Sequence, residues 1–458
     1  MMKALHSALC VALVLSVRAQ AQGENAEADR PKHRHYPHLT SLAYVTPWNS
    51  RGNELVERYR HKLDMVSPVW YTVHVTDEQN NRPYAVRGGP PKKEDEEWYR
   101  RLQQPEKASD GTQSRIKIVP RFMLDGWVED DYRALLFNET RWALLAEAII
   151  GLVDKGAYDG LVFESALTHV LTAPLATLAA ALHARDKDQP NILCLVLPPV
   201  RTPGAFGGDE TVVGQFDRQN QAILAAVETL AEVADYLSIM TYDMTGNGGR
   251  ESKAGREHGY VGDHTLREPG ENTNKDWVRE NMLAFAKTSG AWALPSVDED
   301  DDLAALAYHV DELQHLKTKP RIITQKLLMG YPMYGYQFPI LYMDQKTGKL
   351  SAAPTQGPCT AVIRGAGEAI MASHAVALKP ASGAARTSEM PGSGEQCFEY
   401  EREAHDGWWL ACHPTNKGID EALKTISDVV ETNGRGLGGS GIALWELGQA
   451  VPDLLDRL

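Results

Sequence analysis

The stretch Tyr158–Ala166 reads YDGLVFESA, and it is the segment that decides the fold. Its centre, Gly160–Glu164, is a short apolar run ending in a carboxylate, which is typical of a parallel strand buried on both faces. Because side chains alternate along a strand, Val162, Glu164 and Ala166 are expected on one inward face. The stretch therefore predicts a buried strand with a candidate functional carboxylate near its end.

Seven other short runs have the same apolar character without alternation, so each is predicted to be covered on both faces. In chain order the candidate strands are Ser41–Thr46, Met65–Trp70, Ile116–Phe122, Gly160–Glu164, Ile192–Leu197, Tyr236–Thr241, Lys326–Tyr331 and Gly441–Trp445. Helical spacing predicts helices at Arg141–Lys155, Leu175–Ala184, Gln219–Val233, Trp277–Lys287, Leu303–Leu316 and Asp420–Thr432. Strands and helices in alternation predict an α/β fold, a (β/α)8 TIM barrel. A doubly wound open sheet is the alternative, although no Gly-rich phosphate turn follows the first strand.

Three long segments interrupt this alternation. Residues 72–114 and 245–275 are rich in charged residues, Pro or Gly, and we expect them to be loops. Residues 336–415 are too long for a plain loop, and Asp406-Gly407 between two strand-like runs predicts a hairpin there. We therefore expect a small α+β insertion between strands 7 and 8 of a barrel that spans residues 40–458, preceded by an extension at 23–39.

The N-terminus has the features of a signal peptide. Lys3 gives a positive start, residues 8–15 are apolar, and Ala19–Ala21 offers a cleavage site, so residues 1–22 are predicted to be removed. No later stretch is apolar enough to span a membrane. The mature protein is therefore expected to be secreted or lysosomal, and Asn138, in the sequon Asn138-Glu139-Thr140, is a candidate glycosylation site.

Composition excludes several classes of partner. The net charge of −14 argues against nucleic acids and anionic membranes. The cysteines that follow the signal peptide lack tight Cys-x-x-Cys spacing and the His residues are scattered, so we expect no metal site and no cofactor. Cys359, Cys397 and Cys412 lie in one region, where a disulfide is expected in an oxidising compartment, and the pair Cys397–Cys412 is favoured.

Aromatic side chains gather where the predicted strands end, which is the face where TIM barrels place their sites. Six of the eight strand ends carry an aromatic ring. Such rings stack on the apolar faces of sugars, while carboxylates and Tyr hydroxyls bind sugar hydroxyls. The candidates for stacking are Tyr44, Trp48, Trp70, Tyr334 and Trp445, and the candidates for polar contact are Glu164, Tyr242 and Asp243, with Met240 beside them. Each ring taken alone also fits a cap on the barrel core.

Six motifs in order give the chain a specific resemblance: YVTPWN at Tyr44–Asn49, SPVW at Ser67–Trp70, IVPR at Ile118–Arg121, YDG at Tyr158–Gly160, MTYD at Met240–Asp243 and ALWELGQ at Ala443–Gln449. With them the chain resembles glycoside hydrolase family 18, the chitinases and chitinase-like proteins, and it is most similar to a lectin branch of that family. The resemblance covers residues from about 40 to the C-terminus, and it includes an α+β insertion like 336–415. It implies a TIM barrel that binds chito-oligosaccharide or a related N-acetylated glycan.

The same resemblance shows which acids are missing. The family carries Asp-x-x-Asp-x-Asp-x-Glu on its fourth strand, whose last Glu protonates the leaving oxygen while the substrate's N-acetyl group acts as nucleophile. In this chain the four positions are Asp159, Val162, Glu164 and Ala166. Glu164 would lie about 6–7 Å deeper than the acid position, too far for proton transfer. The resemblance therefore implies a protein that binds sugar and does not cleave it.

Two alternatives stay open at this point. The chain is a weakly active glycosidase if Glu164 or Glu446 acts as a displaced acid, although Glu446 is expected to pair with Arg121 or another base. It is a scaffold for a protein partner if the insertion 336–415 is a docking surface.

Overall fold

A computed structural model describes most of the chain. The described residues are 34–76, 83–107, 113–185, 191–206, 210–286, 326–354, 357–378, 386–390, 392–402, 407–433 and 438–458. The predicted signal peptide, most of the extension 23–39 and the predicted helix Leu303–Leu316 lie outside them. No helix within these ranges is long and apolar enough to cross a membrane.

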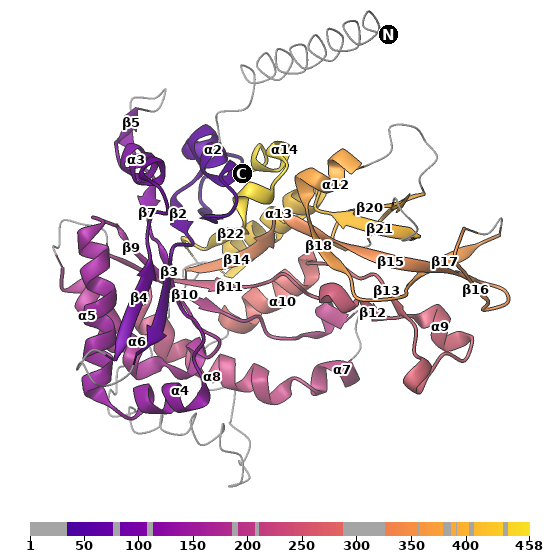
Figure 1. Cartoon of the computed structure of the whole chain (residues 1–458), viewed down its shortest axis with the longest axis horizontal. Coiled ribbons are helices and arrows are strands. Elements are labelled where there is room, and N and C mark those ends of the chain that lie inside the picture. The colour runs from indigo at the N-terminus through magenta and orange to yellow at the C-terminus, as the bar shows by residue number, and fades with distance from the viewer. Residues whose placement is uncertain are drawn as a thin grey trace, which may run out of the picture.

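Parallel strands form a closed barrel, and the predicted TIM barrel is confirmed (Figure 1). Six barrel strands are continuous: β1 (Thr40–Val45), β9 (Gly160–Glu164), β10 (Ile192–Leu197), β11 (Tyr236–Ile239), β14 (Leu327–Pro332) and β22 (Gly441–Trp445). Strand β22 closes the ring between β14 and β1. The two remaining strands are each split. The second consists of β2 (Met65–Pro68) and β3 (Tyr71–Val75), and the third of β7 (Lys117–Ile118) and β8 (Arg121–Leu124). Since β2 pairs with β7 and β3 pairs with β8, the ring has eight members.

Proline explains the two breaks. Pro68 ends β2 and Pro120 separates β7 from β8. Proline has no N–H to donate to a neighbouring strand, so the ladder is interrupted where it stands. The continuous run Ile116–Phe122 predicted from the sequence is therefore two short strands.

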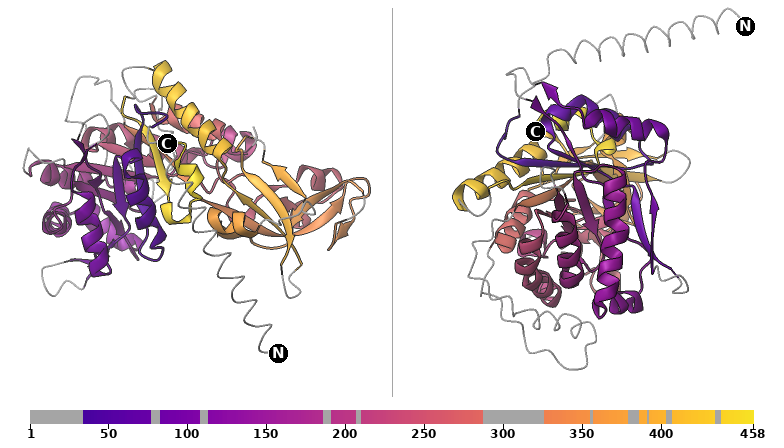
Figure 2. Two further views of the ribbon diagram at one scale, coloured as in Figure 1. Left: turned by 90° about the horizontal axis from the view of Figure 1, so that it is seen from above. Right: turned by 90° about the vertical axis from the view of Figure 1, so that its left-hand side faces the viewer.

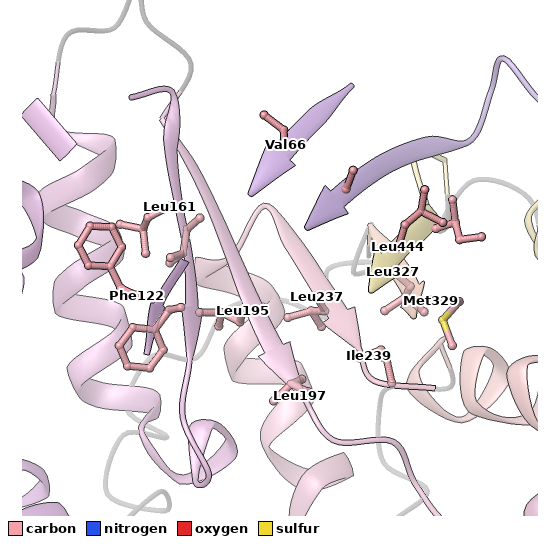
Figure 3. Packing of buried hydrophobic residues seen from close by; sticks show 14 of the residues in the cluster. Val66, Phe122, Leu161, Leu195, Leu197, Leu237, Ile239, Leu327, Met329 and Leu444 are labelled. Carbon is pink, nitrogen blue, oxygen red and sulfur yellow. The ribbon is translucent and has the colours of Figure 1, made fainter. Parts of the chain in front are cut away.

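Helices cover the outside of the barrel (Figure 2). They include α2 (Arg51–Tyr59), α5 (Glu139–Lys155), α6 (Thr172–His183), α8 (Asp217–Val233), α10 (Lys275–Ala286) and α13 (Asn416–Asn433). Outward-facing strand residues such as Phe122, Leu161 and Leu195 pack against them in the main core (Figure 3). Val162 lies in a second cluster inside the barrel with Tyr44 and Cys194, which matches the alternation expected of β9.

The prediction of a loop at 72–114 is wrong. Tyr71–Val75 continues the second barrel strand and pairs antiparallel with β4 (Tyr84–Gly88), and α3 (Lys93–Leu102) follows, with β5 (Glu106–Lys107) and β6 (Gln113–Ser114) as a short pair. Only one face of the β3–β4 pair is buried, so these strands lack the continuous apolar run by which the other strands were predicted.

A second, antiparallel sheet extends from the barrel and forms the orange region of Figure 1. Its central strand, β15 (Tyr334–Asp344), begins two residues after β14 ends, and it pairs with β16 (Leu350–Ser351), β17 (Cys359–Ile363), β18 (Glu368–Met371) and β21 (Trp408–His413). Helix α12 (Ala372–Leu378), β19 (Thr387–Glu389) and β20 (Gln396–Glu401) complete the insertion. Cys397 and Cys412 stand opposite each other on β20 and β21 and are joined by a disulfide, the pair favoured from the sequence.

The segment 245–275 is more than a loop. Its strands β12 (Arg250–Glu251) and β13 (Arg267–Glu268) pair with each other, and β13 pairs with β17, so this segment belongs to the insertion sheet. The short helix α9 (Lys253–Glu257) lies between them. The insertion is thus attached to the barrel by two segments, one after β11 and one after β14.

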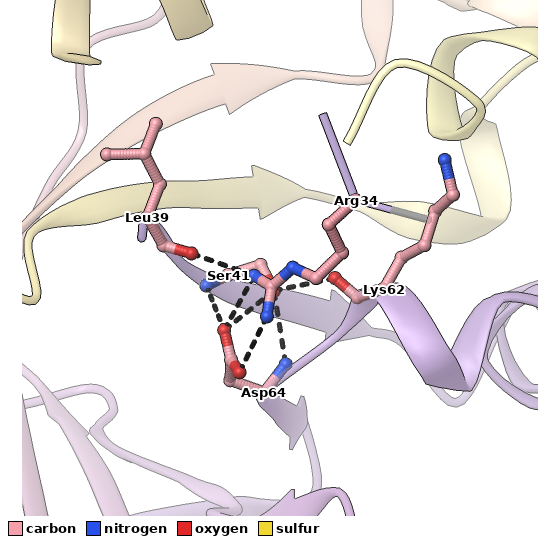
Figure 4. A network of polar contacts seen from close by, with 5 residues as sticks. All are labelled: Arg34, Leu39, Ser41, Lys62 and Asp64. Atoms are coloured by element: carbon pink, nitrogen blue, oxygen red, sulfur yellow. Dashed lines mark hydrogen bonds and ion pairs between the residues drawn. The ribbon is translucent and has the colours of Figure 1, made fainter. Parts of the chain in front are cut away.

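Charged side chains stabilise the amino-terminal side of the barrel (Figure 4). Both oxygens of Asp64 accept from the guanidinium of Arg34, at 2.9 and 2.8 Å, and Oδ2 also accepts from the backbone N–H of Ser41. The ammonium of Lys62, which is fully buried, donates to the carbonyls of Asp456 and Leu458. These bonds tie the C-terminus and the segment before β1 to the start of β2.

Asp159 has a similar structural role one position before β9. Its oxygens accept from Arg115 at 2.9 and 2.6 Å and from the backbone N–H of Ile118 at 2.8 Å. The Asp159 side chain is 2% exposed. Asp159, the first acid of the family 18 motif in the resemblance, therefore connects β7 to β9 at the amino-terminal ends of the strands. It does not lie at their carboxyl ends.

Candidate functional site

The carboxylate at the end of β9 is held in an ion pair. Arg121, the first residue of β8, donates from Nη1 to Oε2 of Glu164 at 2.9 Å. The two side chains are 11% and 19% exposed, so the pair is mostly withdrawn from solvent. The same guanidinium lies over the ring of Trp445, with its carbon 5.9 Å from the ring centroid. Arg121 thus connects the third strand to the ends of the fourth and eighth strands.

Trp445 also has an aromatic partner. The ring of Tyr242 is nearly parallel to it, at 14° and 6.5 Å between centroids. Burial raises the pKa of the Tyr242 hydroxyl well above its usual value, and the charges of Glu164 and Asp243 raise it further. Tyr242 therefore stays protonated at any physiological pH, between the two carboxylates of the site. The peptide bond after Trp445 is cis.

Asp243 receives two tyrosine hydroxyls. Tyr334 and Tyr336, at the start of β15, both donate to its Oδ1, the latter at 2.6 Å. Burial raises the pKa of both hydroxyls, and their bonds to Asp243 add to that effect. The backbone of Asp243 has φ +56°, in the left-handed region that Asp tolerates better than most residues. We call the set Arg121, Glu164, Tyr242, Asp243, Tyr334, Tyr336 and Trp445 the mouth cluster.

A buried asparagine supports this cluster. Asn272, which is 1% exposed, accepts the backbone N–H of Asp243 through Oδ1 at 2.8 Å and donates from Nδ2 to the carbonyl of Tyr334 at 3.0 Å. Its own backbone N–H donates to Oε2 of Glu395 at 2.9 Å. Glu395 is 2% exposed and precedes β20. Burial raises its pKa to about 7, because the charged form loses its hydration.

Three of the predicted stacking residues are buried, so no sugar face can lie on them. Trp70 is 8% exposed and packs among Trp98, Tyr99 and Tyr158 in the outer core. Tyr44 lies inside the barrel, where its hydroxyl donates to Ser238 and its ring meets the edge of Trp445. The structure therefore corrects the stacking role predicted for them, and Tyr334, 6% exposed, contributes its hydroxyl rather than its face.

Two other predicted residues lie outside the mouth cluster. Met240 is partly buried against the cluster inside the barrel. Trp48 is 71% exposed on the turn after β1. Trp445 is thus the one predicted stacking residue that is both part of the mouth cluster and partly open to solvent among the residues the structure describes.

The expected pairing of Glu446 with Arg121 is wrong. Glu446 is 1% exposed and accepts from Nδ2 of Asn49 at 3.1 Å and from the backbone N–H of Gly448 at 3.0 Å. Burial raises the pKa of its carboxyl. It therefore stabilises the turn after β22, and Arg121 pairs with Glu164.

Ala166 does not share the inward face of β9, because the strand ends at Glu164. A turn follows, in which the backbone N–H of Ser165 donates to Oγ1 of Thr168 and Ala166 is exposed. The position where the resemblance requires the catalytic acid thus carries a methyl group on a surface turn.

Arg121, Tyr336, Asn272 and Glu395 are the members of the site that sequence reasoning did not assign. The spacing of Tyr334 and Tyr336, two residues apart on one strand face, was the available signal. Asn272 and Glu395 come from segments predicted as loop and insertion, and nothing in the sequence brings them together. Among the described residues no group of three or more His, Cys, Asp or Glu has the arrangement of a metal site.

The comparisons with solved structures identify the fold. A chitinase from Chromobacterium violaceum matches with a TM-score of 0.54 and 17% identity, over 92% of this chain and 97% of that one. The fold is that of the chitinases. The Bacillus cereus spore cortex-lytic enzyme SleL matches with a TM-score of 0.53 and 12% identity, over 92% of this chain and 73% of that one. A Cycas revoluta GH18 chitinase mutant in complex with (GlcNAc)4 matches with a TM-score of 0.51 and 13% identity, over 92% and 98%. No family model matches the sequence.

The buried charge of Glu395 leads to a prediction for stability. Its folded pKa of about 7 lies above its ordinary value of 4.5, so the folded state binds the proton more tightly. The free energy of unfolding should therefore fall as pH rises from about 4.5 to about 7, by an amount on the order of 3 kcal/mol. In E395Q, urea unfolding at pH 4.5 and pH 8 should lack this component. An unchanged pH dependence in the variant would contradict it.

Proposed function

We propose that this chain is a chitinase-like lectin, of the branch that includes chitinase domain-containing protein 1, which binds chito-oligosaccharide or a related N-acetylated glycan at the mouth cluster without hydrolysing it. The observation that carries the proposal is the ion pair of Glu164 with Arg121 beside a strand end where Ala166 replaces the acid. The fold supports the glycan class, since a Cycas revoluta chitinase of this fold is in complex with (GlcNAc)4.

Binding needs an apolar face and directed polar groups, and the mouth cluster has both. Trp445 supplies a partly open ring that contacts Arg121 and Tyr242. Asp243 is exposed, and its Oδ1 is already oriented by two tyrosine hydroxyls. Such pre-organised groups lose little conformational entropy when a sugar binds.

Hydrolysis needs a protonated acid next to the leaving oxygen. Glu164 contacts the guanidinium of Arg121, which occupies one of its oxygens. Glu446 is buried under Asn49 and its contacts are within the turn that it caps. Neither candidate for a displaced acid is therefore arranged to deliver a proton.

We therefore expect binding without turnover. Titration calorimetry with chitotetraose should give a saturable signal, while a fluorogenic N-acetylglucosamine oligomer should release no product between pH 4 and pH 8. An active family 18 chitinase is the positive control for the substrate. Turnover that disappears in E164Q would contradict the proposal and favour the weakly active glycosidase, and absence of any chitotetraose binding would contradict the lectin.

Secretion belongs to the same proposal. The predicted signal peptide at 1–22 would lead the chain to a secreted or lysosomal destination. The disulfide between Cys397 and Cys412 supports this route, because such bonds persist in oxidising compartments. Asn138 is exposed, and its side chain caps α5 by accepting the N–H of Arg141, so its sequon is accessible. Mass spectrometry of the protein from a secreting cell line tests both the cleavage and the glycan.

A further inference from the structure

We propose that Asn272 is the positioning residue of the sugar site, and that Glu395 controls it from the insertion through its charge. Deprotonated Glu395 holds Asn272, and Asn272 fixes Asp243 and Tyr334, whereas protonated Glu395 loosens all three. The predicted effect on sugar affinity rests on the proposed function, whereas the effect on Asp243 can be measured without any sugar.

Asn272 is the point where three separate segments meet. Its side chain joins the backbone N–H of Asp243, after β11, to the carbonyl of Tyr334, on β15. Its backbone carbonyl accepts the N–H of Met244 at 3.0 Å, and its backbone N–H donates to Glu395. Each polar group of this buried residue therefore makes a hydrogen bond to a neighbouring segment.

Asp243 depends on such support. Its left-handed backbone at φ +56° costs free energy for a residue with a Cβ, so the conformation persists only where the surroundings fix it. The bond from its N–H to Asn272 is the backbone contact that does this. Loss of the bond would let Asp243 relax and would move its carboxylate away from the two tyrosine hydroxyls.

Glu395 is a buried carboxylate, and its surroundings disfavour the charged form. Burial raises its pKa to about 7, the charge of Glu271 raises it as well, and the bond from Asn272 lowers it. The titratable and charged groups near it are Glu271, Arg250 bonded to Glu271, Tyr331, Tyr336, and His413 across from Gln396 on β21. The two tyrosines have raised pKa values and stay neutral near neutral pH. His413 is the neighbour that the experiment controls for.

The direction of the pH effect follows from the bond. An N–H bond to a carboxylate is stronger than one to a neutral carboxyl. As pH falls through about 7, Glu395 takes up a proton and the bond to Asn272 weakens. Affinity for sugar should therefore fall as pH falls, and by linkage bound sugar should weaken proton binding to Glu395 by the same factor, which lowers its pKa.

The first experiment uses the full chain without sugar. The amide resonance of Asp243, followed by NMR from pH 5.5 to pH 8.5, should shift with a midpoint near 7 in the wild type and stay constant in E395Q. E399Q is the matched control, because Glu399 is another buried carboxylate of the same strand pair that bonds to Tyr342 and not to Asn272. An Asp243 resonance that does not titrate, or that titrates equally in E395Q, would overturn the inference. A shift kept in H413Q and lost in E395Q would assign the proton to Glu395.

The second experiment measures chitotetraose affinity by calorimetry. The wild type should bind about three- to tenfold more weakly at pH 5.5 than at pH 8.5. E395Q should bind at both pH values with the weaker affinity, and E399Q should follow the wild type. A purely structural role for Glu395 would change the unfolding midpoint and leave the affinity profile as it is, which would overturn the inference.

The two proposals fail in different ways. If sugar affinity does not depend on pH and the Asp243 amide resonance does not shift, the role of Asn272 and Glu395 is contradicted and the lectin proposal still stands. If the Asp243 amide resonance shifts with pH but no sugar binds at any pH, the lectin proposal is contradicted and the coupling of the insertion to the barrel still stands.

Discussion

Replacing Arg115 with alanine is expected to lower the free energy of unfolding by about 3–5 kcal/mol. The guanidinium of Arg115 makes two bonds to Asp159, whose side chain is 2% exposed. Its removal leaves a buried carboxylate without a counter-ion, and this is what makes the loss large. Because Arg115 itself is 29% exposed, water can reach part of the gap, and the lower end of the range is the more realistic value.

Urea unfolding at pH 7 measures this effect, with R101A as the matched control. Arg101 bonds to Glu57 at a similar distance, 2.8 Å, but the two side chains are 58% and 42% exposed. An exposed pair contributes about 0–1 kcal/mol, so R101A should unfold almost like the wild type. Equal losses in the two variants would contradict the structural role assigned to Asp159.

Replacing Trp445 with alanine is expected to weaken chitotetraose binding about 30- to 100-fold, as the loss of a central aromatic anchor does. The ring of Trp445 is partly open, and contacts with Arg121 and Tyr242 fix its position. The variant removes the apolar face on which a sugar ring would stack, and it also frees Arg121 and Tyr242 to move.

Calorimetry measures the loss, and circular dichroism shows whether the variant is folded. W408A is the control, because Trp408 is also partly buried but packs against Tyr342 within the insertion. The lectin proposal requires W408A to bind like the wild type. Wild-type affinity in folded W445A would place the sugar site elsewhere.

The structure also changes what a deletion of the insertion can test. The sequence offered residues 336–415 as a possible docking surface, and a deletion would isolate that role only if sugar binding survived the deletion. Tyr336 and the strand that carries Tyr334 belong to the insertion sheet, and Glu395 holds Asn272 from it. Deletion would therefore disrupt the mouth cluster, and a scaffold role has to be tested with surface substitutions.

Much of the barrel could be predicted because its signals are local. Gly160–Glu164, Ile192–Leu197 and Gly441–Trp445 have the observed boundaries, since a strand covered on both faces needs an unbroken apolar run. The prediction failed at β3 and β4, where one face is polar, and at the third strand, which Pro120 divides. The boundaries of these strands depend on the strands with which they pair. A pairing strand that is distant in sequence leaves no local pattern.

By itself the sequence determined the kind of strand, the order of the elements and the absence of an acid at Ala166, because residue identity and spacing suffice for these. Only the tertiary structure decided what each polar group does. It paired Arg121 with Glu164, buried Tyr44 and Trp70, and brought Asn272 and Glu395 to Asp243. The physical reason is that hydrogen bonds and ion pairs depend on distances of about 3 Å between residues far apart in the chain, and those distances are set by packing.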